Sequence, residues 1–150
     1  MRAIGLDHVS VTVRDLARSL AFYHELLGLP MLGTGEERGG AAAKVTGLRG
    51  AHFRFADLDL GSGQILELLE YLAPLGTARG HSVNDPGSGH VGIRVDDLAS
   101  LIERLNQAGF VALSSPVELE GPPWWEGAKC VYVSDPDGVV VELVQRPRAP

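Results

Sequence analysis

The hydrophobic and polar positions near the start of the chain alternate in the pattern of a half-buried strand. Across residues 8–13 the three valines fall on one face, while His8 and two hydroxyl side chains fall on the other. Asp15 is then a good N-cap residue and Gly28 a good helix terminator. Between them, hydrophobic side chains recur at helical spacing. We therefore predict a strand and then a helix that packs on the valine face, which leaves the His8 face free of that helix.

The same strand-and-helix pattern occurs again 82 residues later in the chain. Residues 7–17 read DHVSVTVRDLA, and residues 89–99 read GHVGIRVDDLA. The histidine of the first segment matches His90, and its helix-capping aspartate matches Asp97 at the same offset. This offset is too long for a solenoid repeat, whose units run roughly 20–50 residues. We interpret the pattern as a duplicated half-domain, with the second helix expected over residues 98–108.

Each half ends in a predicted hairpin that carries one glutamate. Residues 52–72 contain two alternating strands around a Gly-Ser-Gly turn, and residues 129–144 contain two more around an Asp-Pro-Asp-Gly turn. Glu67 and Glu142 occupy matching positions in the last strands, at an offset of 75 residues. Each half therefore contributes one histidine on its first strand and one glutamate on its last.

The segments between these elements are rich in glycine, proline and charge. Gly33–Gly50 is expected to form a strand edge with a mobile loop, and Val111–Ser114 a short strand. Ser115–Gly127 is expected to be a loop, and Pro74–Gly89 the linker between the halves.

The predicted fold class is α+β, built from two βαβββ modules in tandem. The modules span about residues 3–73 and 88–146 and form a single domain over residues 1–150. Each module is expected to have a helix on the outside of its sheet. The inner faces are then expected to form a curved mixed sheet around a metal-binding cavity.

Composition and charge exclude several classes of protein. The formal net charge of −6, with no basic cluster, argues against a nucleic-acid surface. No hydrophobic run approaches the roughly 20 residues needed to span a bilayer, and the N-terminus lacks a signal-peptide pattern. The single cysteine, Cys130, cannot form an internal disulfide, which fits a cytoplasmic location. Its strand-like surroundings favour a buried, inert thiol.

The two histidines and two glutamates are the chemistry-bearing residues of the pattern. His8, Glu67, His90 and Glu142 all fall on inward-facing strand positions. Imidazole and carboxylate ligands suit one divalent transition metal ion, which could be Zn, Ni, Co, Mn or Fe. Any one of the four could instead be a structural or exposed residue. A metal site is favoured because the histidine and the glutamate recur in both halves, each on the inward-facing side of its strand. His52 remains a possible pocket residue if its strand faces inward.

Several stretches of the sequence resemble the vicinal oxygen chelate superfamily, which includes glyoxalase I, methylmalonyl-CoA epimerase, extradiol dioxygenases and bleomycin-resistance proteins. The matching stretches lie at residues 6–16, 22–23 with 27–29, 66–70, 89–98 and 135–143. The resemblance implies the glyoxalase/bleomycin resistance/dioxygenase fold, a homodimer, a small-molecule substrate and the four metal ligands named above. In residue type this quartet is similar to that of glyoxalase I.

The resemblance also implies an activity. We predict a metal-dependent lyase or an isomerase (epimerase) that stabilises the enediolate of an α-oxygenated carbonyl or thioester substrate. Glu142 and Glu67 are the candidate bases, with Glu142 slightly favoured by analogy. The predicted substrate-binding residues are Arg94, Tyr71, Trp124 and Trp125. Arg94 could equally form a salt bridge, and a tryptophan could serve in packing or at a dimer contact.

Two alternative functions stay open at this point. The first is an extradiol-type dioxygenase with iron on two histidines and one carboxylate, although a fourth ligand at Glu67 would fill a position that dioxygen needs. The second is a non-catalytic protein that binds a drug or another small molecule. Glyoxalase I itself tends to carry Arg and Asn at glutathione contacts where this chain has Thr12 and Tyr71. A glutathione hemithioacetal is therefore not the expected substrate.

Overall fold

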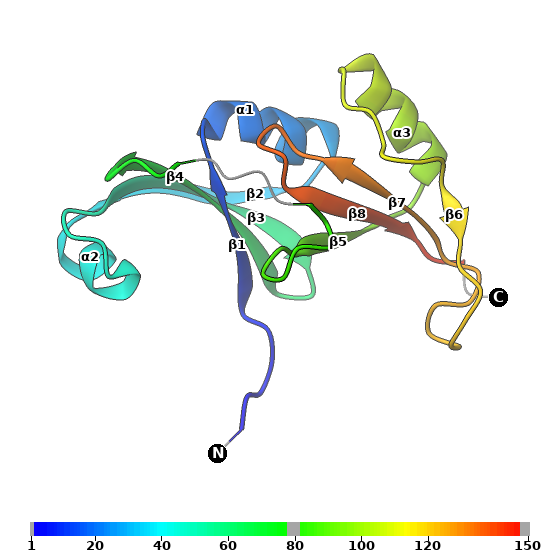
Figure 1. The fold of residues 1–150 in the computed structure, drawn as a ribbon, viewed down its shortest axis with the longest axis horizontal. Helices are drawn as coiled ribbons and strands as arrows, with labels where there is room; N and C mark the ends of the chain where they lie inside the picture. The colour runs from blue at the N-terminus through cyan, green and yellow to red at the C-terminus, as the bar shows by residue number, and fades with distance from the viewer. Residues whose placement is uncertain (1, 78–81, 148–150) are drawn as a thin grey trace. The chain divides into compact units, whose positions relative to one another are not determined.

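The structure is a computed structural model that describes residues 2–77 and 82–147. The chain divides into two compact units, residues 1–79 and 80–150, and the division falls in the predicted linker. Residues 78–81 of that linker lie outside the described part. Each unit runs in the order strand, helix and three strands, and unit 1 has one further short helix, over residues 40–46, between its second and third strands (Figure 1). The predicted α+β fold of two βαβββ modules is confirmed.

Unit 1 is a four-stranded mixed sheet in the order β1-β4-β3-β2. Strand β1 runs parallel to β4, and the other neighbouring strands are antiparallel. Its elements are β1 (His8–Val13), α1 (Leu16–Leu20), the π-helical turn η1 (Ala21–Leu26), β2 (Met31–Arg38), α2 (Gly40–Thr46), β3 (His52–Gly61) and β4 (Gln64–Ala73).

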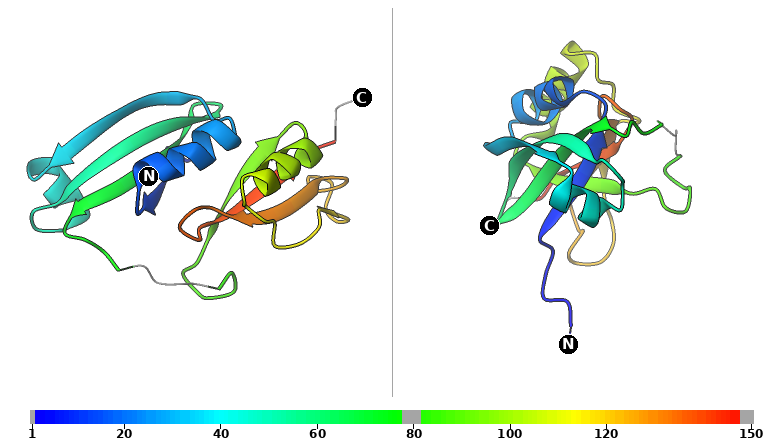
Figure 2. Two further views of the ribbon diagram at one scale, coloured as in Figure 1. Left: turned by 90° about the horizontal axis from the view of Figure 1, so that it is seen from above. Right: turned by 90° about the vertical axis from the view of Figure 1, so that its left-hand side faces the viewer.

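Unit 2 repeats this topology with the order β5-β8-β7-β6. Strand β5 is parallel to β8, and β7 is antiparallel to both β8 and β6. Its elements are β5 (His90–Val95), α3 (Leu98–Gln107), β6 (Val117–Glu118), β7 (Lys129–Ser134) and β8 (Val140–Gln145). The view from above in Figure 2 shows the single long helix of this unit lying along its sheet.

The core of each unit lies between its helix and one face of its sheet, here called the outer face. In unit 1, Val11 on β1 pairs in register with Leu68 on β4, and both are buried together with Phe22 and Tyr23 from the helical segment. The opposite face of each sheet is called the inner face. Because side chains alternate along a strand, burial of this valine set directs His8 to the inner face.

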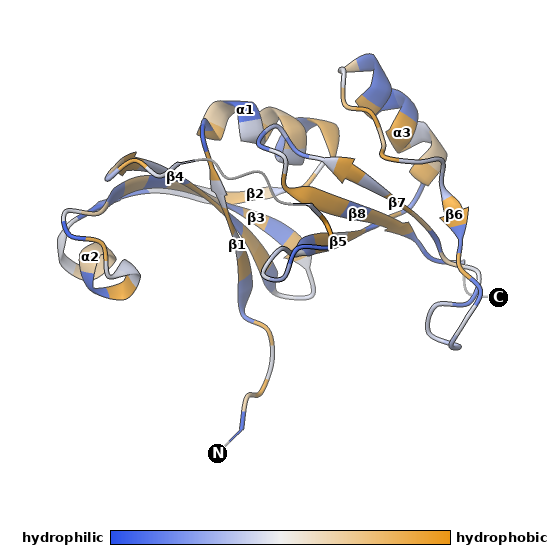
Figure 3. Ribbon diagram, viewed as in Figure 1, coloured by the Kyte–Doolittle hydropathy of each residue, from blue (hydrophilic) through white to orange (hydrophobic). Residues whose placement is uncertain are grey.

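The same rule holds in unit 2, where α3 covers the outer face. Leu98, Leu101 and Leu105 are the buried residues of this helix. In Figure 3, α3 carries hydrophobic and hydrophilic bands, as expected of a helix with one buried side. The buried outer-face residues of the sheet are Ile93, Val131, Val133, Val141 and Leu143.

Both predicted helix starts are confirmed by their capping geometry. The Asp15 side chain accepts a hydrogen bond from the backbone N–H of Arg18 at 3.0 Å. The Asp97 side chain accepts from the backbone N–H of Ser100 at 3.1 Å and from its hydroxyl at 2.7 Å. Beyond the second helix, Gly109 adopts a left-handed backbone with φ 86°, a conformation that glycine reaches without strain.

Two of the predicted segments differ from the structure. Gly33–Gly50 was expected to be a strand edge with a mobile loop. In the structure it contains residues 33–38 of strand β2 and the whole of helix α2. Glycines hid the alternation of β2, whereas three consecutive alanines favour the helix. The expected strand Val111–Ser114 is reduced to a single bridge from Ala112 to Val133, and β6 follows at residues 117–118. Pro116, which has no N–H to donate, separates the two.

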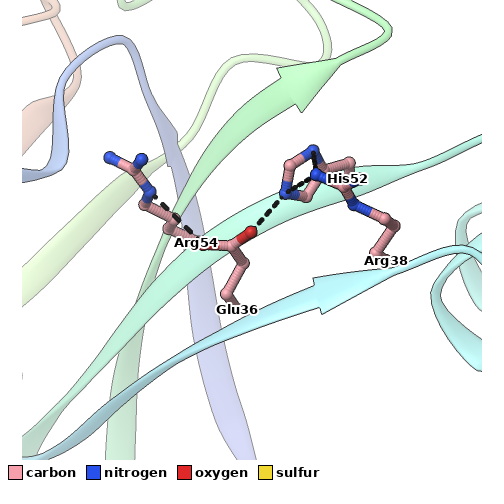
Figure 4. Close-up of polar contacts among 4 residues, drawn as sticks. All are labelled: Glu36, Arg38, His52 and Arg54. Atoms are coloured by element: carbon pink, nitrogen blue, oxygen red, sulfur yellow. Dashed lines mark hydrogen bonds and ion pairs between the residues drawn. The ribbon is translucent and has the colours of Figure 1, made fainter.

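A polar cluster occupies the part of the outer face of unit 1 formed by β2 and β3 (Figure 4). His52 Nε2 donates to Glu36 Oε1 at 2.6 Å, and Arg54 Nε forms an ion pair with Glu36 Oε2 at 3.6 Å. Arg38 Nη2 lies 3.2 Å from His52 Nδ1, which accepts a hydrogen bond in this tautomer. His52 therefore lies on the outer face, away from the His8 face, so the condition set for its being a pocket residue, a strand position facing inward, is not met.

No helix in the described ranges is both long and hydrophobic enough to cross a bilayer.

Replacing Asp97 with Ala is expected to lower the free energy of unfolding by about 1 kcal/mol, because the first turn of α3 loses its cap. Urea denaturation followed by circular dichroism measures this change. Asp96→Ala is the matched control, since it removes the same charge from an exposed neighbour. Equal losses in the two variants would contradict the capping role.

Glu36→Gln is expected to change how stability depends on pH. The hydrogen bond from His52, with smaller contributions from the charges of His52, Arg54 and Arg38, holds the pKa of Glu36 below its ordinary value of 4.5. The ionised carboxylate therefore stabilises the fold above pH 4.5, and this contribution is lost as the pH falls through the lowered pKa.

Thermal unfolding measured across this acidic range should show wild type losing its advantage over Glu36→Gln as the pH falls. Glu37→Gln serves as the control, because the Glu37 side chain points to the inner face. A constant gap between wild type and Glu36→Gln at every pH would refute the prediction.

Candidate functional site

The parallel strand pair of unit 2 brings His90 and Glu142 together. Gly92 on β5 is the register partner of Glu142 on β8. His90 is two residues before Gly92 on β5, so its side chain lies on the same face and diagonally across from Glu142, a relation called one diagonal step below. His90 Nε2 is 3.3 Å from Glu142 Oε2, and the Glu142 side chain is only 14% exposed. A Cβ added to Gly92 would lie 3.7 Å from the same oxygen. That distance is an ordinary van der Waals contact, so a small side chain at position 92 would also fit beside the glutamate.

The parallel strand pair of unit 1 has the same register. Ser10 on β1 is opposite Glu67 on β4, and His8 lies one diagonal step away. His8 Nδ1 donates to Asp7 Oδ1 at 2.8 Å, which leaves Nε2 as the nitrogen with a free lone pair. The hydrogen bond to Asp7 is the largest cause of the raised pKa of His8, and the charges of Glu67, Asp7 and Asp57 add to it.

Each unit therefore supplies one imidazole and one carboxylate from equivalent strand positions. Two ligands of one ion, with bonds of about 2.0–2.2 Å in tetrahedral or octahedral geometry, lie roughly 2.8–3.6 Å apart. The 3.3 Å between His90 Nε2 and Glu142 Oε2 falls in this range. A carboxylate on the far nitrogen of a ligand histidine, such as Asp7 on His8, is the usual second partner of a metal-bound imidazole. The donor set fits a divalent transition metal.

Within residues 2–77 and 82–147, no group of three or more His, Cys, Asp or Glu side chains gathers into a metal-binding cluster. Each unit contributes only two of the four predicted ligands, and the quartet as a metal site stays a prediction.

Glu142 is surrounded by neutral groups. Tyr132 on β7 is its register partner, and the Tyr132 ring lies 5.1 Å from the His90 ring. Cys130 lies on the same face and hydrogen-bonds to Glu142. Burial, and then the Glu142 charge, raises the pKa of both the Cys130 thiol and the Tyr132 hydroxyl. Both side chains are therefore neutral, and the Cys130 thiol is the one that donates to the Glu142 carboxylate.

Glu67 has different surroundings. Its register partner on β3 is Asp57, a second half-buried carboxylate. In the described part of the chain, neither carboxylate has a hydrogen bond or an ion pair. The remaining inner-face residues of unit 1 are Ser10 and Thr12 on β1, Gly33, Gly35 and Glu37 on β2, Phe53, Phe55 and Asp59 on β3, and Ile65, Leu69 and Tyr71 on β4.

The predicted substrate-binding residues fall into two groups. Tyr71 and Arg94 lie on the inner faces of their units, and the Tyr71 ring packs 5.3 Å from the Phe53 ring. Arg94 forms no ion pair with any described residue, so the expected alternative of a salt bridge to a glutamate is not seen.

The two tryptophans lie on the loop between β6 and β7. The Arg146 guanidinium stacks on the Trp125 ring at 4.2 Å and donates to the carbonyl oxygen of Trp124. Trp125 is therefore engaged in packing within unit 2, whereas the Trp124 side chain is 69% exposed. Their role in substrate binding stays a prediction.

Sequence reasoning missed the residues on β3 and β7 that face the two glutamates. Asp57 and Tyr132 each stand ten residues before the glutamate of their hairpin, and each is its register partner. The common spacing was the available signal, but the two residue types differ, so comparison of the repeats did not reveal it. Asp7 was missed because it has a glycine at the equivalent place in the second half.

Three comparisons with known proteins cover most of the chain. A family model described as the Glyoxalase/Bleomycin resistance protein/Dioxygenase superfamily matches residues 5–143. The chain is 31% identical over 149 residues to a 2-epi-5-epi-valiolone epimerase from Actinomyces sp, covering 97% of this chain and 81% of the relative. It is 30% identical over 143 residues to lactoylglutathione lyase from Salmonella typhimurium, covering 93% and 91%.

The fold agrees with these sequence relationships. A crystal structure of a glyoxalase family protein from Bacillus cereus matches with a TM-score of 0.83 and 25% identity, over 97% of this chain and 95% of that one. The chain therefore belongs to the glyoxalase/bleomycin resistance protein/dioxygenase superfamily, as its repeated motifs predicted.

Proposed function

We propose that this protein is a divalent-metal-dependent isomerase or lyase that acts on a small carbonyl compound with oxygen on the neighbouring carbon. The observation that carries this proposal is the repeated histidine–glutamate pair, whose atoms in unit 2 stand 3.3 Å apart. The relatives named as an epimerase and as a lactoylglutathione lyase support an enzyme of this kind. The cytoplasmic location and the homodimer remain predictions.

Within this class, an epimerase or other isomerase is favoured over a glutathione-dependent lyase. Thr12 and Tyr71 stand where glyoxalase I, by resemblance, tends to carry Arg and Asn for glutathione. The Tyr71 ring packs against Phe53, so it offers an aromatic surface in place of an amide. A substrate without the glutathione carboxylates suits this face better.

His8, Glu67, His90 and Glu142 would hold the metal. When bound, a divalent metal would act as a Lewis acid that stabilises negative charge developing on the substrate oxygens. A base must then remove the proton from the carbon beside the carbonyl, and a positioned carboxylate contributes typically 10²–10⁴-fold to such a step.

The contacts of the two glutamates favour Glu67 as this base. Glu142 is held by His90 and Cys130 and faces Tyr132, which suits a stationary ligand. Glu67 has no hydrogen bond or ion pair among the described residues, so its carboxylate can turn toward the substrate at little cost. Analogy with the family had put Glu142 slightly ahead, and the experiments below separate the two roles.

Protein purified without chelator is expected to contain about one transition-metal ion per chain, measured by inductively coupled plasma mass spectrometry. His90→Ala should lose this ion because a ligand is removed. His52→Ala is the matched control, since His52 is bonded to Glu36 on the outer face and should keep the metal. Equal loss in the two variants, or no uptake by wild type, would refute the four-ligand site.

Loss of the substrate α-proton to D₂O, followed by proton NMR, tests the assignment of the base. The proposal predicts exchange with an α-hydroxy ketone such as erythrulose or 2-epi-5-epi-valiolone, and little with the methylglyoxal–glutathione hemithioacetal. Glu67→Gln should retain metal yet slow exchange by about 10²-fold or more, whereas Glu142→Gln should lose metal as well.

The opposite pattern in the two glutamine variants would assign the base to Glu142. Iron retained fully in Glu67→Gln, with no proton exchange in wild type, would support the dioxygenase alternative.

A further inference from the structure

Asp57 is the most unusual residue on the inner face of unit 1. It stands directly opposite Glu67 across the antiparallel β3–β4 pair, where opposite Cβ atoms lie about 4.5–5.5 Å apart. The two like charges repel each other at this distance. Both carboxylates are half-buried, and neither receives a hydrogen bond from any residue in the described ranges.

The duplicated fold does not require an acid at this position. The equivalent residue in unit 2 is Tyr132, which faces Glu142 with the same register and the same ten-residue spacing. The hairpin therefore folds with a neutral side chain there, and Asp57 contributes nothing to the hydrophobic core. Asp57 is half-buried and still open to solvent, so the hydroxyl of a bound ligand could replace that solvent as its hydrogen-bond donor.

The surroundings of Asp57 define which donors could reach it. The described inner-face strand residues of unit 1 include no lysine or arginine; the basic side chain among them is His8, whose raised pKa is due in part to the charges of Glu67 and Asp57, although neither carboxylate forms a hydrogen bond or ion pair with it. Beside Asp57 lies an apolar shelf of Phe53, Phe55 and Tyr71. The Phe55 ring lies directly over Gly35, where an added Cβ would come within 2.5 Å of it. The shelf therefore extends across β2 and would accept C–H groups beside the carboxylate.

We propose that Asp57 determines substrate specificity by accepting a hydrogen bond from a substrate hydroxyl next to the oxygens held at Glu67. This inference rests on the proposed function and names its substrate class: neutral, hydroxyl-rich α-hydroxy ketones. An ionised carboxylate is an acceptor only, so it selects a hydroxyl donor at this place. The same charge disfavours substrates that carry a carboxylate or a phosphate there.

Binding of three hydroxamates to metal-loaded protein tests this proposal without requiring turnover. Acetohydroxamate, glycolohydroxamate and malonomonohydroxamate chelate through the same two oxygens and differ only in a methyl, a hydroxymethyl or a carboxymethyl group. Calorimetry on nickel-loaded wild type should show glycolohydroxamate binding about tenfold more tightly than acetohydroxamate, because it adds one hydrogen bond to a charged acceptor. Malonomonohydroxamate should bind most weakly.

Asp57→Ala is expected to abolish the preference for the hydroxyl, and the nearly isosteric Asp57→Asn should remove the discrimination against the carboxylate. Glu37→Gln is the matched control, since it removes the same charge from the same face at a position opposite Phe53. It should leave the order of the three affinities unchanged. Circular dichroism of both Asp57 variants establishes that the fold is retained.

The outcomes separate this inference from the function on which it rests. Wild type that binds nickel and acetohydroxamate but shows no hydroxyl preference overturns the role of Asp57 and leaves the metal-dependent function standing. Wild type that binds neither nickel nor acetohydroxamate overturns both. A loss of preference in Glu37→Gln as large as that in Asp57→Ala would show a general charge effect and would also overturn the role of Asp57.

Discussion

The register of the two parallel strand pairs is the constraint on which the candidate site depends. Val11 pairs with Leu68 in unit 1, and Ile93 pairs with Leu143 in unit 2, and all four side chains are buried on the outer faces. A slip by one residue would expose these side chains and move every polar residue to the other face. Burial of the core therefore fixes the histidine and glutamate of each unit on one face, one diagonal step apart.

This constraint explains why the sequence could predict that the histidine and the glutamate of each unit share one face. The alternation of residues 8–13 and 90–95 sets which side chains share a face, and the matching offsets identify equivalent positions in the two halves. The helix caps at Asp15 and Asp97 were predictable for the same reason, because a cap depends on only a few neighbouring residues.

The parts that were not predicted depend on partners far away in the sequence. Strand β2 has glycines at alternate positions, so its pattern shows no hydrophobic face, yet its backbone pairs with β3 and the Phe55 ring covers Gly35. The predicted role of Trp125 in substrate binding stays a prediction, but the packing of its ring with Arg146, a residue beyond the last strand, was not foreseen. Neither contact leaves a local signal in the sequence.

The two halves share the positions of their histidine and glutamate but differ in what faces the glutamate. The structure places a tyrosine, a thiol and an imidazole around Glu142, whereas Glu67 faces a second carboxylate and lies one diagonal step from His8. The two halves of a duplicated chain would begin with the same residues around each glutamate. The positions that now differ, those of Asp57 and Tyr132, lie outside the hydrophobic core and outside the predicted ligand set.

Such positions are free to change because the outer-face core already determines the fold. Substitution of the residue opposite a glutamate alters the charge and the hydrogen-bonding groups beside the substrate while leaving the strand register intact. If the proposed role of Asp57 holds, a chain with this fold could acquire new substrates through changes at the strand positions of Asp57 and Tyr132. In this chain, Glu142 of unit 2 would then be the stationary carboxylate and Glu67 of unit 1 the mobile one.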